Sequence, residues 1–228
     1  MGEIHEHHGK GHRERLRERL LRRGGEALGD HELIEYLLAL AIPRRDTKTL
    51  AKALIMEFGG FSALLSADAE AIAKQPGMGE TSTAAIKIVQ AAALRLISEP
   101  ARTRPILSSW QALSDYLHAD MAHRATERVR VLHLDGKNRL IRDELASEGS
   151  IDEAAVYTRE IIRRALDLGS TALILVHNHP SGDATPSRAD IALTRDILEA
   201  GKRLNIQVHD HLIIGKDGHT SMRGQGLI

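Results

Sequence analysis

The 228-residue chain contains no cysteine. Disulfide bonds and thiolate metal ligands are therefore excluded, and a metal site would have to use His, Asp, Glu or water. Aromatic residues make up only 3% of the chain, and the apolar content consists mainly of Ala, Leu and Ile. This composition favours helices.

The chain also lacks a charge imbalance and a long apolar run. Its formal net charge is +0 at pH 7, so the total gives no sign of a protein that coats nucleic acid. No apolar run approaches the roughly 20 residues of a membrane span, and the N-terminus has no secretory signal pattern. Absence of cysteine fits a reducing compartment. We therefore expect a soluble, cytoplasmic protein with no membrane association.

Changes in residue pattern divide the chain into four segments. Residues 1–12 are rich in His and Gly, which predicts a flexible tail. Residues 13–97 show helical periodicity throughout and predict a small all-α domain. Residues 98–105 contain two prolines and several charges and are typical of a linker. Residues 106–228 alternate between helical and strand patterns, which predicts an α/β domain.

The clearest chemical signal lies in this second domain. The apolar run 171–176 predicts a buried strand, and it ends in His177-Asn-His179. Alternate strand residues point to the same face, so both imidazoles can aim at one point. A helix is predicted to begin at Ser187, with Asp190 in its first turn as a third ligand. Two His and one carboxylate leave a position open for water, as in catalytic zinc sites.

The same residues allow a plainer interpretation. With 13 His in the chain, a chance His-x-His pair is not rare, and a second one occurs at His209 and His211. Ser187 and Asp190 also fit a capping box at a helix start. Spacing alone leaves the metal site and this purely structural alternative equally open.

The complete string from His177 to Asp190 resembles the JAMM motif of MPN-domain metallohydrolases. Its residues are more similar still to the RadC family of bacterial proteins. The resemblance covers the whole C-terminal domain and, more loosely, residues 13–97. Three further segments carry it: Arg159-Glu160, Asp210-His-Leu-Ile-Ile-Gly215 and Ser221-Met-Arg-Gly-Gln-Gly226.

The resemblance implies a JAMM/MPN-type domain with a cytidine-deaminase-like α/β sandwich fold. It also implies a zinc ion bound by His177, His179 and Asp190, with Ser187 donating a hydrogen bond to a developing oxyanion. The implied reaction is hydrolysis of an amide or isopeptide bond in a peptide or protein, in which zinc makes hydroxide available near neutral pH. RadC proteins are linked by name to DNA repair, and the resemblance leaves their substrate open.

JAMM enzymes take their general base from a glutamate on an upstream strand. Glu144 and Glu148 are the candidates here, because both are predicted on one face of the strand that follows the hairpin at 135–138. We expect Glu144 to be the base, since Glu148 abuts Gly149, where the strand should end. The alternative is an exposed strand carboxylate with no catalytic role.

Other histidines receive structural interpretations. His133 lies in an apolar strand and is expected to be structural. His209 and His211 would form a second metal site on one interpretation. On the favoured one, Asp210 and His211 support the fold or the first metal site, because metal-bound His needs a hydrogen-bonded surrounding.

The helical domain carries a separate signal. Gln75-Pro-Gly-Met-Gly-Glu80, followed by a helix predicted at 81–97, resembles the helix-hairpin-helix element of DNA-repair proteins. Glycines let a phosphate approach the backbone, and the first amides of a helix favour anions. The first basic residue after the glycines is only Lys87, although the basic helix at 13–23 would compensate. DNA backbone contact and docking onto a protein partner or the hydrolase domain both remain open.

The leading hypothesis is thus a zinc metalloprotease domain joined to a helical adaptor. The first alternative is a non-catalytic, DNA-associated repair factor with a structural metal. A nucleobase-directed enzyme is disfavoured, because such deaminases commonly use a Cys-x-x-Cys zinc pair that this chain cannot supply. The oligomeric state is not predicted.

Overall fold

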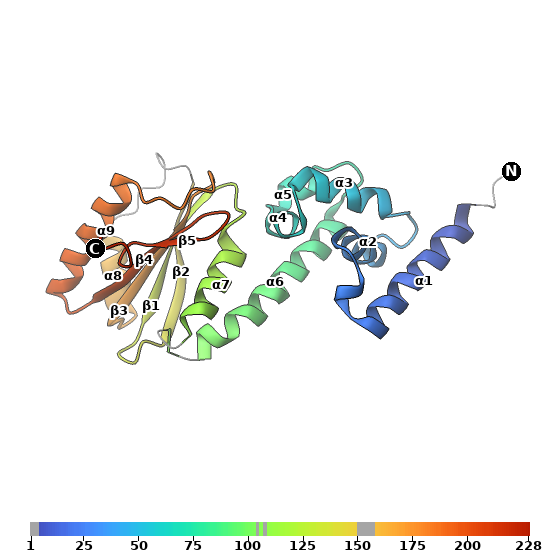
Figure 1. Ribbon diagram of the computed structural model, residues 1–228. Coiled ribbons are helices and arrows are strands. Elements are labelled where there is room, and N and C mark those ends of the chain that lie inside the picture. Colours follow the sequence, from blue (N-terminus) through green and yellow to red (C-terminus); the bar gives the residue numbers. More distant parts are fainter. Residues whose placement is uncertain (1–4, 104, 107–108, 150–157) are drawn as a thin grey trace. The chain divides into compact units, whose positions relative to one another are not determined.

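The computed structural model describes residues 5–103, 105–106, 109–149 and 158–228. The chain divides into two compact units, Met1–Ala92 and Ala93–Ile228. Figure 1 labels their helices and strands. No described helix combines the length and apolar character needed to span a membrane.

The first unit is all-helical, as the periodicity predicts. One apolar core, formed from residues such as Leu38, Leu54 and Ile86, holds the helices between Asp30 and Thr103 together. The unit contains α1 (His5–Arg23), the short η1 (Gly25–Ala27), α2 (Asp30–Ala41), α3 (Lys48–Phe58), α4 (Phe61–Ser66), α5 (Ala69–Ala73) and the first half of α6 (Glu80–Thr103).

Two predicted segments have a different local structure. Helix α1 begins at His5, so residues 5–12 are helical where an irregular tail was expected, and residues 1–4 lie outside the described chain. Helix α6 continues to Thr103, so most of the predicted linker at 98–105 is helical. A helix interior satisfies its own backbone hydrogen bonds, so composition alone does not end it.

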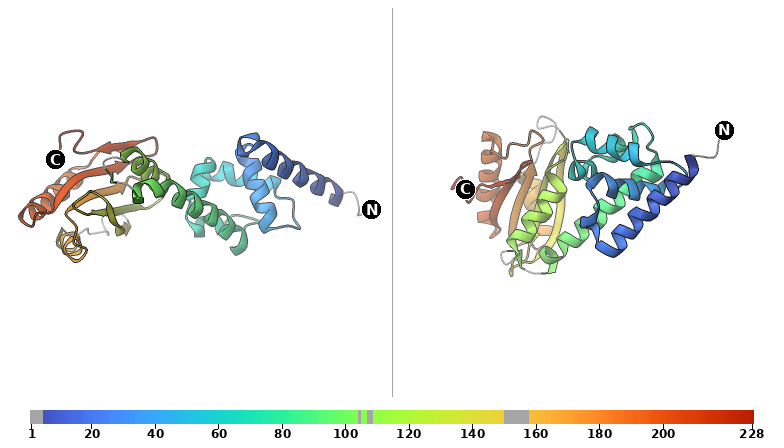
Figure 2. Two further views of the ribbon diagram at one scale, coloured as in Figure 1. Left: turned by 90° about the horizontal axis from the view of Figure 1, so that it is seen from below. Right: turned by 45° about the vertical axis from the view of Figure 1, so that its right-hand side comes forward.

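The second unit is a mixed five-stranded sheet with helices on both faces (Figure 2). The strand order is β2-β1-β3-β4-β5, and only the β3–β4 pair is parallel. This arrangement agrees with the predicted α/β class. The elements are α7 (Trp110–Met121), β1 (Glu127–Leu134), β2 (Leu140–Gly149), α8 (Thr158–Asp167), β3 (Ala172–Asn178), α9 (Arg188–Arg203), β4 (Gln207–Ile214) and β5 (His219–Ser221).

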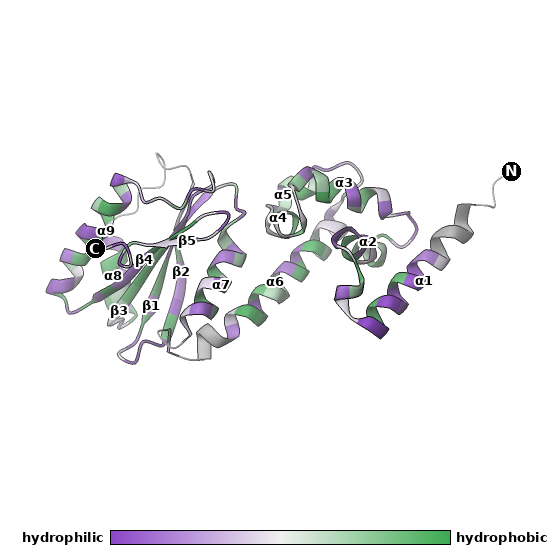
Figure 3. Ribbon diagram, viewed as in Figure 1, coloured by the Kyte–Doolittle hydropathy of each residue, from purple (hydrophilic) through white to green (hydrophobic). Residues whose placement is uncertain are grey.

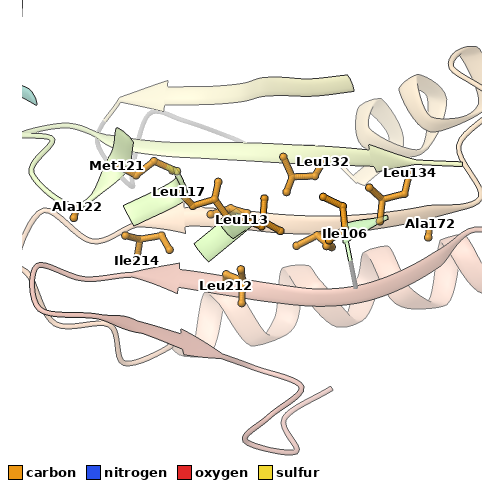
Figure 4. Close-up of a cluster of buried hydrophobic side chains, with 12 residues drawn as sticks. Ile106, Leu113, Leu117, Met121, Ala122, Leu132, Leu134, Ala172, Leu212 and Ile214 are labelled. Atoms are coloured by element: carbon orange, nitrogen blue, oxygen red, sulfur yellow. The ribbon is translucent and has the colours of Figure 1, made fainter. Parts of the chain in front are cut away.

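Strand β3 is buried along its whole length because both of its faces are covered. Ala172, Ile174 and Val176 pack into the core beneath α7, and Figure 4 labels Ala172 in this core. Leu173 and Leu175 pack beneath α8 and α9. Figure 3 shows the resulting hydrophobic character of the central strands. By the same alternation the next residue, 177, faces α9, and residue 178 faces α7.

Strand β4 has an irregular outer edge. Strand β5 pairs only with Leu212–Ile214, so within the described chain the first half of β4 has no strand on that side. The guanidinium of Arg223 covers it by donating to the carbonyls of Val208 (2.8 Å) and His209 (2.5 Å). Backbone acceptors that a neighbouring strand would otherwise use are thereby satisfied.

Candidate metal centre

Three side chains from two elements meet where β3 ends and α9 begins. His177 is the penultimate residue of β3, His179 follows the strand, and Asp190 lies in the first turn of α9. One ligand atom from each lies within 4.8 Å of the others, and they form the metal-compatible group found in the described part of the chain. His177 is buried and the other two are half-buried.

Two imidazole nitrogens and the two oxygens of one carboxylate lie close together in this cluster. The Nε2 atoms of His177 and His179 are 2.9 Å apart. Asp190 places Oδ1 3.4 Å from the first nitrogen and Oδ2 3.6 Å from the second. Bonds of about 2.05 Å at tetrahedral angles separate two ligand atoms by about 3.3 Å. The donor types fit zinc, and because one atom of each residue already lies within 4.8 Å of the others, side-chain rotation would bring a single carboxylate oxygen and both nitrogens to that spacing.

The capping box predicted at the start of α9 is present together with this cluster. The amide of Ser187 donates to Asp190 Oδ2 (2.6 Å), and the amide of Asp190 donates to Ser187 Oγ (3.1 Å). The two interpretations of Ser187 and Asp190 are thus compatible, because the cap aims the carboxylate that faces the histidines. Ser187 itself is exposed beside the site.

Local electrostatics favour a charged carboxylate between the histidines. Burial alone would raise the pKa of Asp190, but hydrogen bonds with His177 and His179 together hold that pKa well below its usual value. The hydrogen bond to Asp190 raises the pKa of His179. The site therefore stabilises positive charge next to Asp190, which a divalent cation also supplies.

Comparison with known proteins agrees with this geometry. Residues 107–227 match the family described as the RadC-like JAB domain. The chain belongs to this family. Residues 10–84 match the UPF0758 N-terminal family, and a UPF0758 protein of Rhodobacter capsulatus is 52% identical over 213 residues, covering 93% of this chain and 100% of the relative. The family resemblance that the motif predicted is confirmed.

In this JAB domain a second histidine lies behind the first ligand. His211 Nε2 is 2.8 Å from His177 Nδ1, and His211 Nδ1 is 2.6 Å from Thr194 Oγ1. Burial lowers the pKa of His211 to about 3, so the ring is neutral. His209 turns instead to Asn138 Oδ1 (2.6 Å). The two histidines thus have different partners, as expected if they do not share a second metal.

The JAB domain does not bring either predicted base to the cluster. Glu144 accepts two hydrogen bonds from Arg164 Nε (3.0 and 2.8 Å). It pairs with Val131 of β1, four residues and roughly 13 Å along the strand from Glu127. The ion pair with Arg164 occupies this carboxylate, so its role as general base stays a prediction that the geometry does not favour.

Glu148 is excluded by the side of the sheet on which it lies. Its carboxylate accepts a 2.6 Å hydrogen bond from Arg128 Nε. Arg128 shares its strand face with Arg130, which bonds Tyr116 of α7. Glu148 therefore lies on the α7 face, opposite to the face toward which His177 points.

Glu127 is the carboxylate that the sequence analysis missed. The register pairs Val129 with His177, and continuing it by two residues places Glu127 opposite His179. Oε2 of Glu127 is buried and has no hydrogen-bond partner in the structure. Burial raises the pKa of this carboxyl, and the two site histidines lower it. Strand alternation contains the signal, because residues 127, 129 and 131 share a face.

Asn178, between the two candidate histidine ligands, connects the site to β1. Its Oδ1 accepts the amide of Arg128 (2.9 Å), and its Nδ2 donates to the carbonyl of Thr126 (3.1 Å). The side chain is only 1% exposed. Both bonds go to main-chain atoms that flank Glu127, so one buried amide fixes the position of that residue's backbone.

Other predicted residues have structural partners. His133 is buried, and its Nδ1 lies 3.0 Å from Ser170 Oγ, which agrees with a structural role. Asp210 accepts hydrogen bonds from Ser221 Oγ and from the amides of His211 and Arg223. These bonds tie the C-terminal segment to β4.

Proposed function

We propose that the RadC-like JAB domain is a zinc-dependent hydrolase that cleaves an amide or isopeptide bond in a peptide or protein. We also propose that the sheet and its helical layers form a JAMM/MPN-type, cytidine-deaminase-like sandwich. One observation carries it: a partnerless buried carboxylate oxygen of Glu127 lies on the same sheet face as the His177, His179 and Asp190 cluster. A purely structural metal site has no use for such an oxygen.

His177 and His179 through Nε2, and Asp190 through its carboxylate, would hold the ion. When bound, zinc supplies an acidified water molecule and polarises the scissile carbonyl. Glu127 takes the water proton at Oε2 and passes it to the leaving nitrogen. Its raised pKa suits this exchange, because an acid–base catalyst works best with a pKa nearer the operating pH.

Ser187 is the proposed oxyanion donor. Its Oγ already accepts the amide of Asp190, which leaves the hydroxyl hydrogen free to point outward. The residue lies at the N-terminus of α9, where the helix dipole favours negative charge. A tetrahedral oxyanion formed beside the cluster would therefore be stabilised by both the hydroxyl and the helix end.

The decisive experiment compares zinc-loaded full-length protein with its Glu127→Gln variant on a proteome-derived peptide library and on isopeptide-linked substrates. New peptide termini, detected by mass spectrometry, are expected with the wild type and not with the variant or after chelation. Circular dichroism should show a retained fold after chelation. A wild type that holds zinc, cleaves nothing and unfolds on chelation would instead support the structural-metal alternative.

DNA backbone contact by the helical unit stays a prediction. At the glycine turn, the amide of Gly79 already donates to Ser82 Oγ (2.9 Å), and Lys87 Nζ donates to the carbonyls of Leu65 (3.2 Å) and Ala67 (2.9 Å). Both groups are thus engaged within the unit. Fluorescence anisotropy with duplex DNA tests the contact, which requires affinity that falls steeply with salt.

A further inference from the structure

A buried hydrogen-bonded chain leads from one metal ligand to another. It runs from His177 Nδ1 to His211 Nε2 (2.8 Å), from His211 Nδ1 to Thr194 Oγ1 (2.6 Å), and from Thr194 Oγ1 to the carbonyl of Asp190 (2.5 Å). His211 is 1% exposed and Thr194 is 0% exposed. Because water has no access to these two side chains, each must satisfy its polar atoms within the chain.

The direction of every bond follows from the ligand at its head. When Nε2 of His177 binds a metal, the hydrogen of the neutral ring lies on Nδ1 and is donated to His211. His211 must accept at Nε2, and its own hydrogen therefore lies on Nδ1. Thr194 accepts that hydrogen and has one left to donate.

The remaining hydrogen of Thr194 has two acceptors within reach. The carbonyl of Asp190 is 2.5 Å away, whereas the sulfur of Met222 is 3.8 Å away and is a weak acceptor. The bond therefore goes to the carbonyl one helical turn back. The chain thereby returns to the residue that supplies the carboxylate, and it connects the end of β3 to the first turn of α9 through β4.

We propose that His211 and Thr194 are positioning residues that select the metal-binding tautomer of His177 and hold its ring and the Asp190 turn at ligand spacing. The proposal rests on the zinc site proposed above. A neutral histidine is unusual in this position, where a carboxylate or a backbone carbonyl is common. Unlike a carbonyl, the His211 ring both accepts and donates a hydrogen bond. It therefore links the orientation of His177 to Thr194 on α9.

The test measures the dissociation constant for zinc, by competition with a chromophoric chelator, in full-length variants. His211→Leu removes both bonds and should weaken zinc binding about 10–100-fold, the usual effect of losing a partner behind a ligand. His211→Gln can accept from His177 and donate to Thr194, so it should stay near wild type. His209→Leu is the matched control on the same strand, since His209 bonds Asn138 and not a ligand.

A second pair of variants tests the other end of the chain. Thr194→Val replaces only the hydroxyl with a methyl group and should also weaken zinc binding, whereas Thr194→Ser should not. This pair keeps the inference testable if His211→Leu does not fold. Nitrogen-15 spectra of the metal-free protein should show His177 and His211 each protonated at Nδ1, with a tautomer mixture at His177 in the leucine variant.

The outcomes separate this inference from the proposed function. A wild type that binds no zinc would overturn the zinc hydrolase, and the nitrogen-15 spectra would still decide whether His211 fixes the tautomer. If the wild type binds zinc and folded His211→Leu and Thr194→Val bind it equally tightly, the positioning role is wrong and the hydrolase proposal stands. Loss of affinity in His211→Gln equal to that in His211→Leu would show a requirement for volume and would also overturn the role.

Discussion

The side chain of Asn178 on β3 forms hydrogen bonds to the main chain on both sides of Glu127, which lies on β1. The last residue pair of the regular β1–β3 ladder is Val129 and His177. Beyond it, the side-chain amide of Asn178 makes the hydrogen bonds between the two strands. Asn178 therefore couples the position of the two candidate histidine ligands to the position of Glu127, the proposed base.

We expect Asn178→Ala to release the start of β1. The amide of Arg128 and the carbonyl of Thr126 would lose their partners, at a cost of about 1–3 kcal/mol each if they stay buried. Native-state hydrogen exchange should show faster exchange at the Arg128 amide, with cleavage reduced and zinc binding retained. Thr126→Ala is the control, because only the main chain of Thr126 takes part, and it should behave as wild type. Unchanged exchange at Arg128 would contradict the arrangement.

Glu127→Gln should retain zinc and lose hydrolysis. The substitution keeps the shape of the side chain but removes its ability to accept a proton, a change of about 10²–10⁴-fold in rate for a general base. Glu144→Gln is the matched control on the neighbouring strand, where the carboxylate is paired with Arg164. Steady-state rates on the identified substrate provide the measurement. A rate lost in Glu144→Gln but kept in Glu127→Gln would restore the base predicted from the sequence.

Asp190→Asn removes the charge of the proposed carboxylate ligand and should abolish the increase in the free energy of unfolding that zinc produces. At a zinc concentration 100 times its dissociation constant, binding adds about 2.7 kcal/mol to the free energy of unfolding. In Asp190→Asn the amide oxygen still caps α9, but the charge that His177 and His179 stabilise is lost, so the metal-free variant should be less stable than the metal-free wild type. The zinc-induced shift is therefore compared within each protein. Thermal unfolding with zinc and with chelator checks this. An equal zinc-induced shift in wild type and variant would place the ion elsewhere.

The Arg19–Glu32 pair in the helical unit predicts a pH-dependent contribution to stability. Arg19 donates two hydrogen bonds to the Glu32 carboxylate (2.7 and 2.8 Å), and this contact lowers the pKa of Glu32 to about 2. A depressed pKa means that the stabilisation is complete above the unfolded pKa, about 4.3, and fades as the pH falls toward 2. Because the pair is exposed to solvent, we expect this contribution to be small.

Urea unfolding of wild type and Glu32→Gln at several pH values measures this contribution. The difference in unfolding free energy should be constant above about pH 5 and shrink on acidification. Exposed Glu26, substituted in the same way, serves as a control that should show no such trend. A difference that grows on acidification would contradict the assignment.

The elements that form locally could be predicted from the sequence. Helical periodicity predicted the all-α character of residues 13–97 and the start of α9, and the apolar run located β3, so the candidate ligand pair His177 and His179 followed from strand alternation. Asp190 followed from its place in a first helical turn. Each of these inferences uses residues close together in the chain, where spacing determines geometry.

The contacts between distant strands could not be predicted in the same way. Glu127 reaches His179 only through the β1–β3 register, and His211 reaches His177 only after the shift in β3–β4 pairing between Leu173 and Ile174. The ion pair of Glu144 with Arg164 was not predicted, because Arg164 lies on α8. Such side-chain meetings depend on tertiary packing, which residue spacing along one element does not contain.

The guanidinium of Arg223 lies across the outer edge of the start of β4, the side on which no strand of the described chain pairs with it. An uncovered strand border is a template on which a second molecule can add its own backbone, and aggregation begins in this way. Arg223 thus disfavours self-association. A chain cut before this residue would expose the Val208 and His209 carbonyls to neighbouring molecules. Trimming a few terminal residues would therefore affect colloidal behaviour before it affected the metal ligands.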